Sequence, residues 1–217
     1  MSENKFRTLG IYADGMVLQR NTVNCIFGDG ASGEVKLSFR DVTATAAAAP
    51  DGTWKIEYNP GEAGGPFELK LESAGSTITF KDVWVGEVWV NSGQSNAQLP
   101  MDRLRYSYPH EMRLPKDNNI RMITVPITFS YDGPKGSVEN PTWICASPQT
   151  IHLMSGTAYF FASNLSKELG VPVGIINASQ GGSPITSPGR PVRRRGRCPW
   201  TSRGTGNCRP PNSSWDT

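Results

Sequence analysis

A serine in a small polar turn is the residue of this sequence best suited to chemistry. Ser95 lies in the run Ser-Gly-Gln-Ser-Asn (residues 92–96), directly after the apolar residues 83–90. A buried strand that ends in such a turn presents side chains at the carboxyl end of a sheet, where ligands bind in open α/β sheets. Gly93 allows a sharp bend, and a short helix after Ser95 would favour negative charge beside it. The pattern favours a nucleophile at Ser95, with Ser92 as second candidate and a plain polar loop as the alternative.

A second glycine-bearing turn follows another apolar stretch. Residues 171–177 predict a short buried strand, and Ala-Ser-Gln-Gly-Gly-Ser-Pro-Ile (residues 178–185) follows it. The adjacent Gly181 and Gly182 let a backbone N–H approach a bound oxyanion without interference from a side chain. The alternative is an ordinary glycine turn between a strand and a helix. The residues leave open which of the two glycines donates.

A serine nucleophile also needs a base, and usually a carboxylate that orients the base. His110 and His152 are the two histidines of the chain, and neither has an aspartate three residues before it. We expect surface or structural roles for both histidines, and we expect Asp102 and Glu111 to be solvated loop charges. The residues therefore supply a candidate nucleophile without a recognisable base.

Several motifs in order resemble those of one family. The run Val-Gly-Glu-Val-Trp-Val-Asn-Ser-Gly-Gln-Ser-Asn (85–96) resembles the first signature block of the sialate O-acetylesterases, which are SGNH-type (GDSL-like) carbohydrate esterases. Asp-Gly-Met-Val-Leu-Gln-Arg (14–20) resembles the opening block of that family, and residues 171–185 resemble its second catalytic block. Residues 51–54 and 63–69 resemble its N-terminal β-domain. The resemblance covers residues 6 to 186, and it departs from the family at Gln180 and Ser187, where tryptophans are usual.

The resemblance implies a serine carboxylic-ester hydrolase that removes O-acetyl groups from sialic acid or related acetylated sugars. It implies Ser95 as the nucleophile, an oxyanion hole built by the N–H groups of Ser95 and of Gly181 or Gly182, and no metal or organic cofactor. In the family the base, its aspartate and a third oxyanion donor lie downstream. The resemblance ends near Ile185, so we expect a chain truncated after the second catalytic block and an impaired esterase. The alternatives are a non-enzymatic carbohydrate-binding β-sandwich with a degenerate hydrolase fragment, and a xylan or other polysaccharide acetylesterase.

The periodicity of the chain predicts an α/β fold in three segments. Residues 1–81 alternate apolar and polar side chains between turn clusters, which predicts an accessory β-sandwich. Residues 82–186 predict the N-terminal part of a three-layer α/β/α hydrolase domain with a parallel sheet, left incomplete. Within it, residues 119–125 and 171–177 are expected strands, and residues 126–150 are expected to be irregular. Residues 187–217 predict a disordered tail.

Residues 154–169 carry the clearest helical pattern. Their predicted apolar stripe consists of Ala158, Phe161, Ala162, Leu165 and Leu169. Ser155 or Thr157 is suited to cap the start of this helix, and Gly170 is suited to a left-handed C-cap. A helix that leads directly into a strand is half of a βαβ unit.

The charge of the chain is concentrated at one end. Seven of its 22 basic residues and one of its 19 acidic residues follow Pro188, so the tail carries +6 and the rest −3. We interpret the tail as the product of a frameshift, with a basic nucleic-acid-binding arm as the rival interpretation. We expect no nucleic-acid partner and no membrane partner, and the oligomeric state stays open. The first residues lack an apolar signal segment, and the four cysteines show no disulfide or metal spacing, so we expect a cytoplasmic protein.

Overall fold

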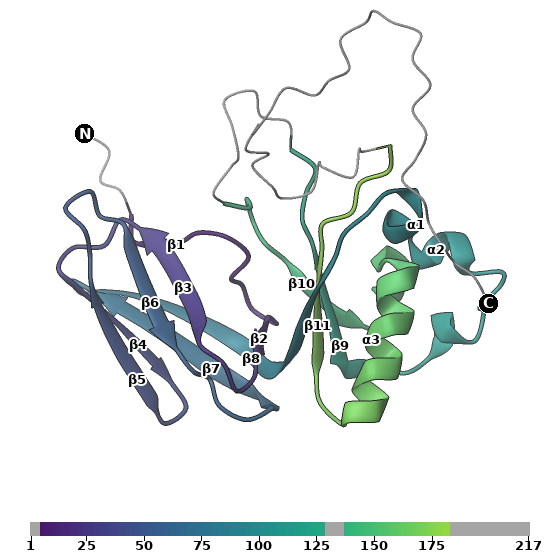
Figure 1. Cartoon of the computed structure of the whole chain (residues 1–217), viewed down its shortest axis with the longest axis horizontal. Helices are drawn as coiled ribbons and strands as arrows, with labels where there is room; N and C mark the ends of the chain where they lie inside the picture. The colour runs from purple at the N-terminus through teal and green to yellow at the C-terminus, as the bar shows by residue number, and fades with distance from the viewer. Residues whose placement is uncertain (1–4, 129–136, 183–217) are drawn as a thin grey trace, which may run out of the picture.

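The computed structural model describes residues 5–128 and 137–182. It has an α/β fold with β-sheets and few helices (Figure 1). The strands are β1 (Arg7–Thr8), β2 (Val17–Gln19), β3 (Asn24–Asp29), β4 (Glu34–Phe39), β5 (Val42–Ala47), β6 (Trp54–Tyr58), β7 (Gly64–Ser73), β8 (Ser76–Asn91), β9 (Asp117–Thr124), β10 (Trp143–Ala146) and β11 (Val173–Asn177). The helical elements are α1 (Ser95–Gln98), α2 (Met101–Leu104), α3 (Gly156–Leu169) and the 3-10 turns η1 (Glu111–Arg113) and η2 (Ile151–Leu153).

One mixed sheet runs through the described part of the chain. Its strand order is β10-β9-β11-β8-β7-β4-β5, and β2 pairs with β8 beside this path. β8, β11 and β9 are parallel to one another, whereas β7, β4 and β5 continue the sheet in antiparallel fashion. A smaller antiparallel sheet consists of β1, β3 and β6. The α/β class is thereby confirmed, and the larger sheet is mixed because a β meander joins its parallel part.

The N-terminal strands bury alternate side chains, as the sequence predicts. β4 buries Val35, Leu37 and Phe39, and β6 of the smaller sheet buries Trp54 and Ile56. These side chains belong to one apolar core, which both sheets therefore share. A second core lies under α3, and the two cores meet opposite faces of β11.

β8 is longer than the strand predicted over residues 83–90, and it passes through residues 81 and 82, the predicted domain boundary. The expectation that this strand is buried is wrong at its end, where Trp89 is 47% exposed and Val90 is 64% exposed. Val90 lies beside Ile176 of β11, on the face turned away from α3. The first core covers that face as far as Val88, so Val90 lies beyond its edge.

α3 begins two residues later than the predicted helix. Ser155 caps it by accepting a hydrogen bond from the Ala158 N–H, and Gly170 ends it in the left-handed conformation, at φ 65°. The predicted apolar stripe is only partly right, because Phe161 and Leu169 are more than 40% exposed. The buried face consists of Ala158, Tyr159, Ala162 and Ser166. The side chain of Phe161 instead meets the ring of Trp89 edge-on, with ring centroids 5.3 Å apart.

β10 falls within the stretch expected to be irregular. It pairs antiparallel with β9, and its register shifts between Cys145 and Ala146. Four residues with such a shift give too short a pattern for periodicity to show. Cys25 and Cys145 are half-buried free cysteines. Cys198, Cys208 and the whole predicted tail lie outside the described residues. No helix in residues 5–128 and 137–182 is long and apolar enough to cross a membrane.

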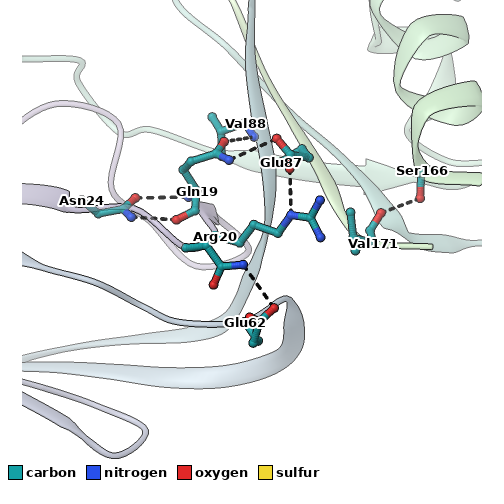
Figure 2. Close-up of polar contacts among 9 residues, drawn as sticks. Gln19, Arg20, Asn24, Glu62, Glu87, Val88, Ser166 and Val171 are labelled. Carbon is teal, nitrogen blue, oxygen red and sulfur yellow. Dashed lines mark hydrogen bonds and ion pairs between the residues drawn. The ribbon is translucent and has the colours of Figure 1, made fainter. Parts of the chain in front are cut away.

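A polar junction fixes β2 against the middle of β8. Figure 2 shows the Gln19 side chain between the two strands, where it donates to Glu87 Oε2 at 3.1 Å and accepts from the Val88 N–H at 2.7 Å. Arg20 Nε donates to Glu87 Oε1 at 2.8 Å. The bond from Gln19 lowers the pKa of Glu87, partial burial opposes this change, and Arg20 reinforces it. The motif at residues 14–20 thus binds the motif at residues 85–96 directly.

A buried arginine joins β9 to β8 and to the residues just before β2. Arg121 of β9, whose side chain is 3% exposed, donates to both carboxylate oxygens of Asp82 at 2.7 and 3.1 Å. It also donates to the Gly15 and Asn118 carbonyl oxygens, and its guanidinium lies 4.9 Å from the centroid of the Trp84 ring. Partial burial raises the pKa of Asp82, but the hydrogen bonds from Arg121 and Trp84 outweigh it and hold that pKa below its usual range.

Candidate active site

Ser95 lies at the carboxyl end of β8, where the sequence places it. The strand ends at Asn91, a turn follows, and Ser95 is the first residue of α1. Gly93 in the turn has φ 153°, and a Cβ added there would lie 3.0 Å from Ala97 Cβ, so the turn requires glycine. Ser95 is exposed. Ser92 is exposed too, but it precedes the glycine and lies outside α1.

The loop after β11 runs alongside this turn. The Ala178 N–H donates to the Asn91 carbonyl oxygen at 2.8 Å, and the Gln180 N–H donates to the Gly93 carbonyl oxygen at 2.9 Å. These bonds continue the parallel pairing of β8 and β11 past the ends of both strands. They bring the two glycine-bearing turns together, although about 85 residues separate them in the sequence.

Gly181 is the glycine that lies against Ser95. A Cβ added at Gly181 would lie 3.7 Å from Ser95 Cα and 3.9 Å from Ser95 Cβ. The N–H of Gly181 donates to Gln98 Oε1, the side-chain oxygen of the last residue of α1, at 2.8 Å. Gly182 has φ 76°, and a Cβ added there would have no atom within 4 Å. The structure therefore brings Gly181 and Ser95 together, and it shows no such approach for Gly182.

The first turn of α3 holds the short helix that carries Ser95. Ser155 Oγ donates to the Ala97 carbonyl oxygen at 2.7 Å, and Thr157 Oγ1 donates to the Asn96 carbonyl oxygen at 3.1 Å. The Gly156 N–H donates to the Leu99 carbonyl oxygen at 2.8 Å. α1 has only four residues and no side-chain cap of its own, so these external bonds fix its position.

Two asparagines form a polar network beneath the turn. Asn91 Nδ2 donates to Asn177 Oδ1 at 2.8 Å and to the Ala97 carbonyl oxygen at 3.0 Å. Asn177 is buried, and its Oδ1 also accepts from Ser179 Oγ at 2.6 Å. A buried amide network with satisfied partners specifies one arrangement of the groups that it joins. The network thus fixes the side chains at the ends of β8 and β11 and joins Asn91 to the backbone of α1.

The sequence interpretation missed Asn91 and Asn177 and gave Ser155 only a capping role. A signal for the asparagines was present, because each is the last residue of an apolar parallel strand, where a polar side chain points toward the ligand edge. The hydrogen bond from Ser155 to the Ala97 carbonyl oxygen leaves no such signal in the sequence, since it depends on how α3 packs against α1.

The other candidate side chains lie apart from Ser95. His110 is exposed next to η1, and His152 is half-buried within η2. In the described part of the chain, no hydrogen bond joins either histidine to Ser95. Asp102 forms an exposed ion pair with Arg105 at 2.8 Å, so its charge is solvated as expected, but it lies in the helix α2 and not in a loop. Across residues 5–128 and 137–182, no group of three or more His, Cys, Asp or Glu residues could hold a metal ion.

Known proteins resemble this chain over most of its described length. No family model matches the chain. Sialate O-acetylesterase of Rattus norvegicus is 29% identical over 198 residues, which is 83% of this chain and 36% of the rat protein. The protein of the same name from Homo sapiens is 28% identical over 211 residues, which is 88% of this chain and 40% of the human protein.

A solved structure agrees with these relatives. The crystal structure of a carbohydrate acetylesterase from Xanthomonas citri aligns with a TM-score of 0.76 at 33% identity, over 82% of this chain and 41% of that chain. The chain thus spans about two fifths of the length of the relatives that it matches. These likenesses confirm the resemblance to the sialate O-acetylesterase family that the motifs indicate.

Proposed function

Because the chain is related to the sialate O-acetylesterases, we propose that it is a serine esterase that removes O-acetyl groups from sialic acid or related acetylated sugars. The observation that carries the proposal is the approach of Gly181 to Ser95, which unites two motifs distant in the sequence. Such an arrangement is what a serine nucleophile and an oxyanion donor require. The names of the relatives, sialate O-acetylesterase and carbohydrate acetylesterase, support an O-acetylated sugar as the substrate.

The reaction follows the usual course of acyl transfer through serine. Ser95 Oγ attacks the acetyl carbonyl carbon, and the hydroxyl proton passes to a base. The bond between the carbonyl carbon and the sugar oxygen breaks, and the sugar leaves as an alcohol after it takes up a proton. Water then cleaves the acyl-serine, which releases acetate and restores Ser95. No organic cofactor or metal takes part in this scheme.

The oxyanion of the tetrahedral intermediate needs donors that are already in place. We assign this role to the N–H groups of Ser95 and Gly181, with Gly182 as the alternative second donor. The loss of one such donor typically costs about 3 kcal/mol of transition-state stabilisation. Among the described residues, no general base is hydrogen-bonded to Ser95. The rate of ester hydrolysis by this chain therefore depends on these oxyanion donors. We therefore propose an impaired esterase.

We further infer the layering that the fold class implies. The apolar core shared by β4, β6 and β7 supports an N-terminal β-sandwich. α3, which packs on the face of β9 and β11, supports one helical layer of an α/β/α hydrolase domain of the SGNH type. The limits 1–81 and 82–186 remain proposals, as do a cytoplasmic location and the absence of nucleic-acid and membrane partners.

Acetate release tests the proposed function. The purified chain is incubated with O-acetylated sialic acid and, separately, with acetylated xylan, each with and without added imidazole as an external base. We expect imidazole to increase acetate release more in the wild type than in Ser95→Ala, because imidazole hydrolyses the ester directly in both samples and only the wild type adds a route through Ser95. Preference for one of the two substrates identifies the sugar. Equal release by wild type and Ser95→Ala under all conditions contradicts the proposal.

A further inference from the structure

The oxyanion donor beside Ser95 already has a partner within the protein. The Gly181 N–H donates to Gln98 Oε1 at 2.8 Å, a normal hydrogen-bond length. Gln98 is exposed and is the last residue of α1, whose first residue is Ser95. A substrate oxygen can therefore bind the Gly181 N–H only after the Gln98 side chain has moved away from it.

Helix geometry puts the Gln98 side chain on the face of α1 that Ser95 occupies. Residues three apart in a helix are neighbours on its surface. The loop at Gly181 meets this same face, because an added Cβ there would lie 2.8 Å from Gln98 Oε1 and 3.9 Å from Ser95 Cβ. An acetyl group on Ser95 Oγ that used the Gly181 N–H would place its oxygen where Gln98 Oε1 now lies.

We propose that the Gln98 carboxamide is a built-in ligand of the Gly181 N–H, which the substrate oxygen must displace during the reaction. This inference rests on the proposed function of Ser95 and Gly181, and it assigns Gln98 as a residue that sets how tightly the site holds neutral and charged acceptors.

The displacement discriminates between ground state and transition state. An ester carbonyl is a neutral acceptor like the Gln98 amide, so it gains little by taking the place of that amide. The oxyanion is charged, and hydrogen bonds to charged acceptors are roughly twice as strong, so it displaces Gln98 with a net gain. A donor that bonds preferentially to the transition state raises kcat rather than substrate affinity. Gln98 thus reserves the Gly181 bond for the oxyanion.

Two substitutions at Gln98 have opposite expected effects. Gln98→Ala frees the Gly181 N–H, so neutral and anionic ligands both bind more tightly there. Gln98→Glu puts a stronger, charged acceptor on the N–H and repels an incoming anion. Because Gln98 is exposed, neither change removes a buried group, and folding is preserved. Gln149→Ala is the matched control, since Gln149 is another exposed glutamine, which lies outside α1 and the loop after β11.

Acetate, the carboxylate product, is the probe for a test that needs no catalytic base. The chain is labelled with ¹⁵N-glycine, and the Gly181 amide resonance is followed by NMR during titration with acetate. We expect Gln98→Ala to lower the dissociation constant of acetate by about three- to tenfold, as for the removal of one competing hydrogen bond. Gln98→Glu should abolish the shift, and Gln149→Ala should match the wild type.

The kinetic counterpart separates this role from a structural one. With acetate release as the assay, Gln98→Ala should lower KM by a similar factor without raising kcat, whereas damage to the site would lower kcat. Equal acetate affinity in the wild type and both Gln98 variants, weaker binding in Gln98→Ala, or no acetate response at Gly181 in any variant would overturn the proposal. An intact acetate response in a chain that shows no Ser95-dependent hydrolysis would refute the proposed function and leave the assignment of Gln98 standing.

Discussion

The two halves of the signature motif at residues 85–96 lie in contrasting surroundings. The junction around Gly86 and Glu87 is closed, and a Cβ added at Gly86 would lie 2.0 Å from the Pro172 carbonyl oxygen. The turn around Ser95 is open, and the one tight contact of a Cβ added at Gly181 beside it would be the tip of the Gln98 side chain, at 2.8 Å. A reactive side chain needs a rigid support and an accessible position, and here the packing around Gly86 is rigid while the turn around Ser95 is exposed.

The difference shows that one motif can hold residues with separate tasks. Glu87 and Gly86 keep β8 against β2 and β11, whereas Ser95 is accessible to a ligand. Substitutions in the junction should therefore change stability first, and substitutions in the turn should change reactivity first.

The largest effect is expected for Gly86→Ala. Its new methyl group would overlap the backbone of Pro172, which cannot move without disturbing β11, so we expect the free energy of unfolding to fall by about 3 kcal/mol. Gly181→Ala is the matched substitution at the open end, and it should cost less than about 1 kcal/mol, because a flexible side chain can yield. Urea unfolding of both variants measures the contrast. Similar losses in the two variants would show that the contrast between closed and open ends is wrong.

The next effect concerns the buried charge of Arg121, which pairs with Asp82. Asp82→Asn leaves Arg121 buried without its carboxylate, and we expect a loss of about 2 kcal/mol, less than for a fully buried pair because Asp82 is half exposed. Asparagine tolerates the positive φ of this position, 54°, so the backbone is kept. The control is Asp102→Asn at the exposed pair with Arg105, which should cost under about 0.5 kcal/mol. Thermal unfolding distinguishes the two, and an equal change in both would rule out a special role of Arg121.

A smaller effect is expected where α3 holds α1. Ser155→Ala removes both the helix cap and the bond to the Ala97 carbonyl oxygen, which should lower stability by about 1–2 kcal/mol. It should also slow covalent modification of Ser95, because α1 loses one of its external bonds. Ser163→Ala, within the same helix, is the control. Unchanged Ser95 reactivity in a folded Ser155→Ala variant would show that the bond from Ser155 to α1 does not position Ser95.

The smallest effect is a dependence of stability on pH. The pKa of Asp82 and that of Glu87 are both lowered in the folded chain. Such carboxylates contribute stability above their unfolded pKa of about 4, and this contribution is lost as pH falls through the lowered values. We expect the urea midpoint to be level near neutrality and to decline below about pH 4.5, with a shallower decline in Asp82→Asn. Identical declines in that variant and the wild type would exclude Asp82 as a contributor.

The sequence predicts regular elements better than the contacts between them. Alternation reveals β4 and β6 because each buries one face, and the run before Ser95 reveals the strand that leads to it. β10 cannot be predicted from periodicity, because it is short and its register with β9 shifts. The exposure of Val90 cannot be predicted either, since the residue type alone does not show whether another layer of the fold covers an apolar side chain.

The candidate site shows the same division. Ser95 and the pair Gly181 and Gly182 stand out in the sequence because small residues after buried strands fit the chemistry of a nucleophile and an oxyanion donor, but only the structure shows that Gly181 is the glycine beside Ser95. The supporting roles of Asn91 and Asn177, and the bond from Gly181 to Gln98, are not predictable, because each depends on a hydrogen bond that forms only once β8, β11 and α1 are in place. Backbone pairing of β8 with β11 decides these partners, and no local pattern encodes it.

Covalent modification tests the central assignment of Ser95 most directly. The chain is incubated with a fluorophosphonate probe, and the modified residue is located by mass spectrometry in the wild type, Ser92→Ala and Ser95→Ala. We expect modification at Ser95 in the wild type and in Ser92→Ala, and none at this turn in Ser95→Ala. Modification at Ser92, or equal modification of all three chains, would contradict Ser95 as the nucleophile.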